Sequence, residues 1–118
     1  MARHNFRNLK IWKDGVDFVI SSYSITNKFP ESEKFNLTSQ LNRCAVSIPS
    51  NIAEGSAKAT DKHFKTYLET SLGSAFEWET QFIVAFKLNY VSEEIFNQNI
   101  EEIKKLQRMI GAFIDRLT

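Results

Sequence analysis

Polar side chains recur at intervals of three and four residues in the middle of the chain, a spacing that places them on one face of a helix. The set comprises Gln40, Arg43, Ser47, Asn51 and Glu54. On a later helix, Ser74 and Glu77 could pair with these side chains. Two interpretations are open. In one, these residues form an interhelical network of hydrogen bonds and ion pairs, with Arg43 facing Glu77 or Glu54. In the other, Arg43, Asn51 and Glu54 bind a ligand or nucleic acid.

No catalytic constellation accompanies this polar stripe. A Cys–His nucleophile would need Cys44 beside His63 or His4, but Cys44 falls among the apolar residues of its helix, where cysteine usually packs as a small hydrophobic residue. Gly55 and Gly73 are isolated and form no phosphate-binding loop. We therefore expect neither catalysis nor a cofactor, with an enzyme or small-ligand binder that uses the polar stripe as the alternative.

Metal-binding patterns are also lacking. The two histidines lie far apart in the sequence and give no compact zinc spacing. The acidic pairs Glu93–Glu94 and Glu101–Glu102 are not followed by a Glu-x-x-His motif, which disfavours a di-iron bundle. We expect no metal.

Basic residues form two groups that could contact phosphates. The formal net charge is only +1, which argues against a surface that binds polyanions throughout. Residues 1–28, however, hold five basic and two acidic side chains. The candidate nucleic-acid contacts are Arg3, Arg7, Lys10 and Lys13 in the first group and Lys58, Lys62 and Lys65 in the second. Such contacts would be weak and independent of base sequence.

The composition favours one helical domain over residues 1–118. The chain has 118 residues, of which 42% are hydrophobic, with only four Gly and two Pro. These values fit a single core and disfavour both a turn-rich β-sandwich and disorder. Apolar runs such as Phe82 to Phe86 are too short to span a bilayer. Because one cysteine cannot form an internal disulfide, we expect a cytoplasmic location.

Local signals predict four helices. The first runs from Leu9 to Lys28, before Phe29–Pro30. The second begins after Ser32 as N-cap, ends at Gly55, and is expected to bend but not break at Pro49.

The third predicted helix begins after Thr60 as N-cap and continues to about Asn89, and the fourth begins after Ser92. Short connections make successive helices antiparallel neighbours. The sequence therefore predicts an all-α, up-down-up-down antiparallel four-helix bundle.

Each helix carries an apolar stripe that is expected to face the core. The predicted core residues are Leu9, Trp12, Val16, Val19, Tyr23 and Thr26 in the first helix; Leu37, Leu41, Cys44, Ile48 and Ile52 in the second; Phe64, Leu68, Ser71, Ala75, Trp78, Phe82 and Ala85 in the third; and Phe96, Ile100, Ile103, Ile110, Phe113 and Leu117 in the fourth.

The first and third helices each carry a second apolar stripe. These stripes either widen the core or bind a second copy of the chain, and we favour self-association because large apolar patches are rare on monomers. The expected interface residues are Ile11, Gly15, Phe18, Ser22 and Ile25 in the first helix and Phe76 and Ile83 in the third.

The stretch from Gln40 to Gly55, QLNRCAVSIPSNIAEG, resembles the signature of the four-helix-bundle proteins encoded in intervening sequences of bacterial 23S ribosomal RNA genes. Further matches extend the resemblance over nearly the whole chain: Leu9, Trp12, Phe29–Pro30, Glu33, Phe64, Leu68, Gly73–Ser74 and Glu77. The resemblance implies a homopentameric ring without established catalysis. The chain is also similar to accessory proteins of diversity-generating retroelements, which implies a basic surface that binds RNA or DNA.

Overall fold

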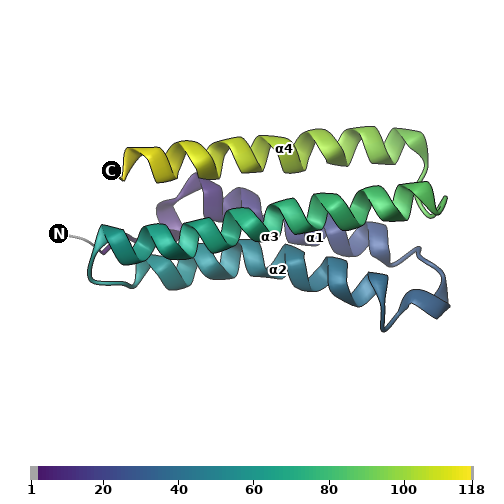
Figure 1. Ribbon diagram of the computed structural model, residues 1–118, viewed down its shortest axis with the longest axis horizontal. Coiled ribbons are helices and arrows are strands. Elements are labelled where there is room, and N and C mark those ends of the chain that lie inside the picture. Colours follow the sequence, from purple (N-terminus) through teal and green to yellow (C-terminus); the bar gives the residue numbers. More distant parts are fainter. Residues whose placement is uncertain (1–2, 118) are drawn as a thin grey trace.

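Four antiparallel α-helices make up the computed structural model, which describes residues 3–117 (Figure 1). They are α1 (Lys10–Thr26), α2 (Leu37–Ser56), α3 (Asp61–Lys87) and α4 (Glu93–Arg116). The short 3-10 turns η1 (Phe6–Asn8) and η2 (Glu31–Glu33) precede α1 and α2. The molecule measures 48 × 25 × 19 Å, and the predicted all-α four-helix bundle is confirmed.

Helices α3 and α4 begin where the sequence predicts. The hydroxyl oxygen of Thr60 accepts a hydrogen bond from the backbone N–H of His63, and that of Ser92 accepts one from Ile95, each at 3.2 Å. Each cap satisfies a donor that the first turn of a helix leaves without an intrahelical partner.

Ser32 is not the N-cap of α2, so that prediction is wrong. Ser32 lies inside η2, and the chain turns once more before α2 begins at Leu37. The backbone N–H of Leu37 is instead bound by the Glu33 carboxylate at 3.3 Å. The other oxygen of Glu33 accepts a hydrogen bond from the Tyr90 hydroxyl at 2.8 Å, so one carboxylate links the α1–α2 and α3–α4 connections.

Helix α3 ends at Lys87 and not at Asn89 as expected. Asn89 has a φ of 65°, in the left-handed region, and the N–H groups of Asn89 and Tyr90 bind the carbonyls of Phe86 and Ala85. This pair of bonds is a Schellman motif, in which asparagine takes the position that glycine usually occupies. Helix α1 likewise ends early, at Thr26.

Gly55 does not end α2, because the helix continues through Ser56 and the glycine has no positive φ. Its role is close packing against α3. A Cβ atom at Gly55 would lie 2.6 Å from the Cβ of Tyr67 and 2.8 Å from a ring carbon of Phe64. Glycine is therefore required at this position by the approach of α3.

Helix α2 continues through Pro49 without a break, as expected. Pro49 is buried, and a Cβ atom at Gly15 of α1 would lie 3.3 Å from the Pro49 Cβ. The helix crossing between α1 and α2 thus places the smallest residue of α1 against the proline ring.

The predicted core faces of α2 and α3 are confirmed. All seven predicted residues of α3 are buried, as are the predicted residues of α2 except Leu37, which is half-buried. In α4, Ile100, Ile103 and Ile110 are buried, and Phe96, Phe113 and Leu117 are half-buried against the core. Three residues of the α4 core were not predicted: Asn99, Leu106 and Ile114.

The core face of α1 is the stripe that the sequence analysis assigned to a second copy. Ile11, Gly15, Phe18 and Ser22 are buried within the single chain, and of the predicted core residues of α1 only Thr26 is buried. The prediction that these four residues form a subunit interface is therefore wrong. Ile25 is half-buried and packs against the core.

A chain of aromatic contacts explains this choice of face. Phe18 packs edge-on against Trp78 with ring centroids 4.5 Å apart, and the Trp78 ring stacks on Phe82 at the same centroid distance. The indole N–H of Trp78 donates a hydrogen bond of 3.0 Å to the Ser22 hydroxyl. A buried tryptophan usually needs a partner for its N–H, and Ser22 supplies one on this face of α1.

Candidate functional site

The polar stripe lies along a groove between α2 and α3. Six residues line a cavity of about 360 Å³ there: Gln40, Arg43, Cys44 and Ser47 from α2, and Ser74 and Glu77 from α3. The hydroxyls of Ser47 and Ser74 are 2.8 Å apart and hydrogen-bonded, and the Asn51 amide donates to the Ser47 hydroxyl at 2.9 Å. This part of the stripe is therefore an interhelical hydrogen-bond network.

The expected ion pair of Arg43 is not formed. Arg43, Glu54 and Glu77 are all exposed, and Arg43 has no carboxylate within 4.0 Å among residues 3–117. Arg43 and Glu77 instead flank the groove as separate, solvated charges. Gln81, which the spacing analysis omitted, joins the network because its amide donates to Gln40 and to Glu77, each at 3.5 Å.

Cys44 lies at the base of this groove with its thiol protonated. Burial, followed by the neighbouring Glu77 carboxylate, raises the pKa of the Cys44 thiol to about 12. Its sulfur also donates a hydrogen bond to Gln81 at 3.8 Å.

Neither histidine is placed to activate the thiol. His63 lies in the first turn of α3, about 27 Å along the helix from Gln81, the α3 residue that contacts Cys44, at a rise of about 1.5 Å per residue. His4 binds the Asp61 carboxylate at 3.1 Å at the same end of α3. Neither histidine is therefore within reach of the Cys44 thiol as a general base.

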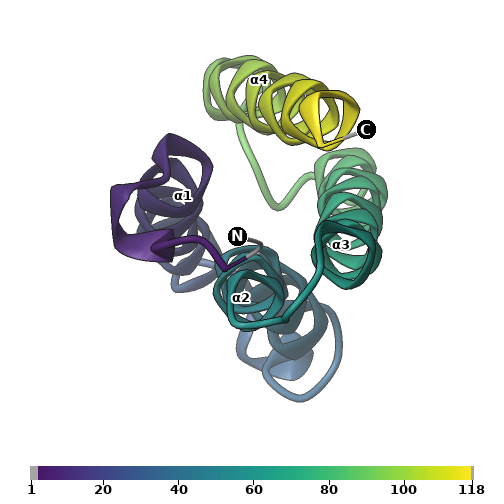
Figure 2. The same cartoon turned by 90° about the vertical axis from the view of Figure 1, so that its left-hand side faces the viewer.

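The two predicted basic groups meet at one end of the bundle, where the N-terminal segment crosses the α2–α3 turn (Figures 1 and 2). The Arg3 guanidinium donates to the Ala57 carbonyl at 3.1 Å, and the His4 backbone N–H binds the Ser56 carbonyl at 3.2 Å. Arg3 therefore lies next to Lys58, although the two are far apart in the sequence.

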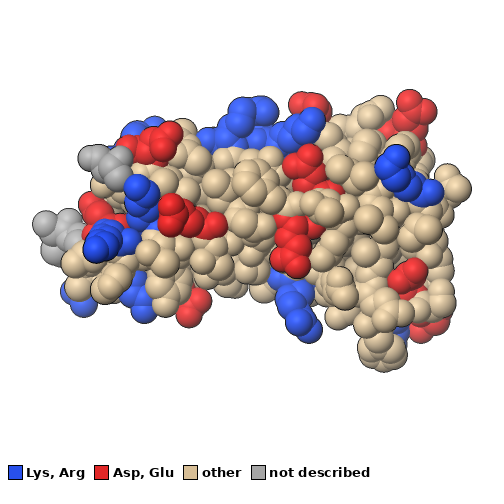
Figure 3. Space-filling view, in the orientation of Figure 1, with Lys and Arg blue, Asp and Glu red and all other residues tan. Residues whose placement is uncertain are grey.

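Several of these cations already have partners within the chain. Lys10 forms an ion pair with Asp14 at 2.9 Å, Arg7 lies over the Phe6 ring, and Lys58 lies over the Tyr67 ring. Lys13 and Lys62 are exposed, and Lys65 is half-buried. Spacing analysis also missed a basic patch over the middle of α4, visible along the upper edge of the molecule in Figure 3, whose exposed residues are Lys104, Lys105 and Arg108.

Large apolar side chains are exposed on each of the four helices. On the α1–α2 surface, Ile20 is 64%, Tyr23 49% and Val46 39% exposed. Val46 lies between Asn42, which hydrogen-bonds Thr26 of α1, and Pro49, which packs against α1. It therefore borders the same helix as Ile20 and Tyr23. On α3 the expected interface residue Phe76 is 52% exposed, whereas Ile83 is half-buried.

The described residues form neither a metal-binding cluster nor a helix suited to span a membrane. Within residues 3–117, no three His, Cys, Asp or Glu side chains are grouped so that they could hold a metal ion. None of the helices in this part of the chain combines the length and the apolar character that crossing a membrane requires.

The fold and the polar interhelical groove define an antiparallel four-helix bundle of the all-α class. A family profile described as "23S rRNA-intervening sequence protein" matches residues 7–112. The chain belongs to this family.

A solved structure supports the same fold. The chain is similar to a crystal structure of a protein of unknown function from the S23 ribosomal protein family of Bacteroides thetaiotaomicron, with a TM-score of 0.82. The two share 18% sequence identity over 89% of this chain and 95% of the other. At that identity the likeness establishes the fold alone. No curated protein matches the sequence.

Proposed function

We propose that the protein is a non-catalytic subunit of a homo-oligomer that acts as an interaction module. The exposed apolar surface formed by Ile20, Tyr23 and Val46 carries the proposal. Burial of such side chains against another chain stabilises an assembly by roughly 25 cal/mol per Å² of apolar surface removed from water, before the cost of association is subtracted. The family resemblance adds the expectation of a pentameric ring.

Sedimentation velocity of the purified protein tests self-association. We expect a species heavier than the 13.6 kDa monomer at micromolar concentration, and about 68 kDa for five copies. Ile20→Glu should dissociate it without unfolding the chain, because Ile20 is exposed in the monomer. Ala112→Glu, which adds the same charge at an exposed position of α4, is the matched control. A monomer at 100 µM would refute the proposal.

A weak association with RNA or DNA is the second candidate, and the meeting of Arg3 with the Lys58 region favours it. Repetition of this basic end in an oligomer would multiply weak phosphate contacts through avidity. Binding would neutralise phosphates without reading bases, so the log–log dependence on salt should have a slope of about −0.7 per phosphate contact on single strands.

Fluorescence anisotropy with labelled RNA and DNA at low and moderate salt tests the second candidate. The variant that replaces Lys58, Lys62 and Lys65 by alanine should bind more weakly than wild type. The matched control replaces Lys28, Lys34 and Lys87, three exposed lysines at the other end of the bundle. Absence of binding at low salt would leave a protein-interaction scaffold without a nucleic-acid role as the better account.

A further inference from the structure

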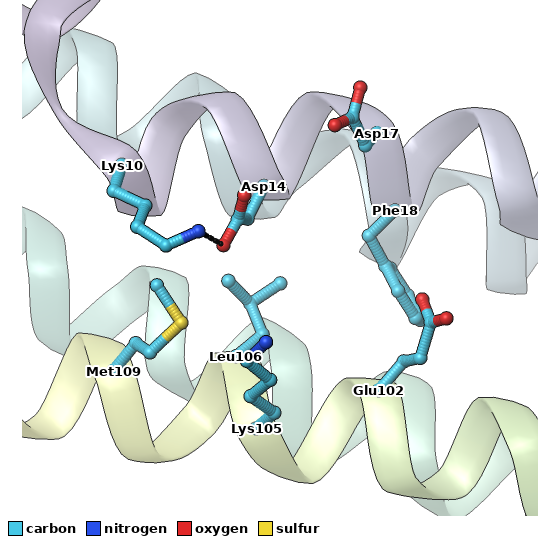
Figure 4. A pocket seen from close by; sticks show the side chains of 8 residues that line it. All are labelled: Lys10, Asp14, Asp17, Phe18, Glu102, Lys105, Leu106 and Met109. Atoms are coloured by element: carbon cyan, nitrogen blue, oxygen red, sulfur yellow. Dashed lines mark hydrogen bonds and ion pairs between the residues drawn. The ribbon is translucent and has the colours of Figure 1, made fainter.

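Helices α1 and α4 are the least extensively packed pair of neighbours, and a cleft of about 270 Å³ lies between them (Figure 4). Charged residues border this cleft on both helices. Lys10, Asp14 and Asp17 line it from α1, and Glu102 and Lys105 line it from α4. Closer approach of α1 and α4 would remove water from these charged side chains at a cost in free energy, and this cost keeps the edges of the cleft apart.

The floor of the cleft is apolar. Phe18 and Leu106 are each only 3% exposed and form the boundary with the core, and the flexible side chain of Met109 is half-buried beside them. Five of the eight lining residues are charged and three are apolar, so charged edges surround a small apolar floor, and the volume lies just below the range of about 300–1,000 Å³ that is common for small-molecule sites. The cleft therefore suits a ligand of the size of a single amino acid.

The charges at the edges are not equally available. Lys10 and Asp14 bind each other at 2.9 Å, and Asp17 points away from the cleft (Figure 4). Glu102 and Lys105 extend from α4 towards α1 (Figure 4), and neither has an ion-pair partner within 4.0 Å in the described part of the chain. One free carboxylate and one free ammonium group thus stand about one helical turn apart above an apolar floor.

We infer that the α1–α4 cleft is a binding site for a small zwitterion with an apolar side chain, such as a free aliphatic α-amino acid. The ligand carboxylate binds the Lys105 ammonium group, and the ligand ammonium group binds the Glu102 carboxylate. The aliphatic side chain lies on Phe18, Leu106 and Met109. Because the edges are open to water, the affinity is on the order of millimolar.

Ligand-observed saturation-transfer NMR with L-leucine tests this site, because the signal does not require the protein assembly to be small. We expect saturable transfer to leucine. Isoamylamine and 4-methylpentanoate, which each lack one of the two charges, should bind about threefold more weakly, as expected for the loss of one solvent-exposed ion pair.

Substitutions in the protein test whether leucine binds in the α1–α4 cleft. Glu102→Gln and Lys105→Met should each weaken leucine binding about threefold. Glu101→Gln and Lys104→Met, at exposed neighbouring positions that do not line the cleft, should leave it unchanged. Met109→Trp should abolish binding by filling the cleft, with circular dichroism confirming that the helices remain. Absence of saturable transfer at 20 mM leucine would overturn the inference. Equal binding by the three ligands, or equal effects of the cleft and control variants, would overturn it too.

Discussion

Cys44 shows how the surroundings of one residue decide whether it can react. Sequence spacing placed it on an apolar stripe, and the structure adds Gln81 and Glu77 as its polar neighbours. A thiol that is held protonated is a poor nucleophile, since the thiolate is the reactive form.

Native Cys44 should therefore resist alkylation. With a pKa of about 12 in place of 9.0, the thiolate fraction at pH 8 falls about a thousandfold. Iodoacetamide at pH 8, followed by mass spectrometry, should modify the folded protein far more slowly than the urea-unfolded chain. Similar rates in the two states would contradict the burial of this thiol.

Tyr90 should make the stability of the bundle sensitive to alkaline pH. Its hydrogen bond to Glu33 raises the pKa of the phenol above 10.0, with burial adding to the shift. The folded state thus favours the neutral phenol. This contribution is complete below pH 10 and is lost as the pH rises through the higher folded-state pKa. Urea denaturation between pH 8 and 11 should show a steeper loss of stability for wild type than for Tyr90→Phe. If stability fell in parallel with pH in the two proteins, Tyr90 would not be the source of the alkaline sensitivity.

Arg43 offers a test of the polar stripe. Removal of one partner of a buried ion pair would cost about 3–5 kcal/mol, but exposed charges contribute about 1 kcal/mol or less. Because Arg43 is exposed and lacks an ion pair among the described residues, Arg43→Ala should hardly change the melting temperature. Ser74→Ala, which removes a hydrogen bond to Ser47, should lower it more. If Arg43→Ala lowered the melting temperature more than Ser74→Ala, the interpretation of Arg43 as part of a buried ion pair would be restored.

Among the elements, α1 shows where sequence patterns stop being sufficient. Periodicity assigned the right core face to α2 and also to α3, although α3 carries a second apolar stripe. Helix α1 has two stripes, and the bulkier one with Trp12 and Tyr23 was assigned to the core. Packing selects the other stripe because Gly15 admits Pro49 and Ser22 binds Trp78. Small residues fix helix contacts that a count of apolar residues undervalues.

Like the core faces of the helices, the α2–α3 groove could be predicted from the sequence only in part. The three- and four-residue spacing found the residues that line the α2–α3 groove, because they share helix faces. It omitted Gln81, although Gln81 continues the three- and four-residue spacing of Ser74 and Glu77 along α3. Nor did it find the α1–α4 cleft, since that site depends on how closely two helices distant in sequence approach.

Two glycines provide a matched pair at the scale of helix packing. Gly55→Ala should destabilise the protein by about 1–3 kcal/mol, because the new methyl group overlaps with Tyr67 and Phe64. Gly73→Ala should stabilise it by about 0.5–1 kcal/mol, since no atom lies within 4 Å of the added Cβ and alanine favours helix. Chemical denaturation measures both. Equal effects of the two substitutions would contradict the close contact at Gly55.

At the scale of the whole molecule, burial decides which substitutions can report on assembly. Phe18→Glu would place a charge in the core beside Trp78 and unfold the chain, so it cannot distinguish a lost interface from a lost fold. Ile20 and Phe76 are exposed in the single chain, and charge there can separate subunits while the bundle persists. Positions two residues apart on α1 thus give different kinds of information.

The contact of His4 with Phe113, at a centroid distance of 6.3 Å, brings the beginning and the end of the described chain together. The order in which the helices are connected is therefore separable from their arrangement in space. A circular permutant that joins the two ends through a short Gly–Ser linker and is opened beside Phe35, the most exposed large hydrophobic residue in the α1–α2 connection, should still form all four helices. Its α1 would then follow α4 directly, so the two helices that are farthest apart in the natural sequence would become neighbours along the chain.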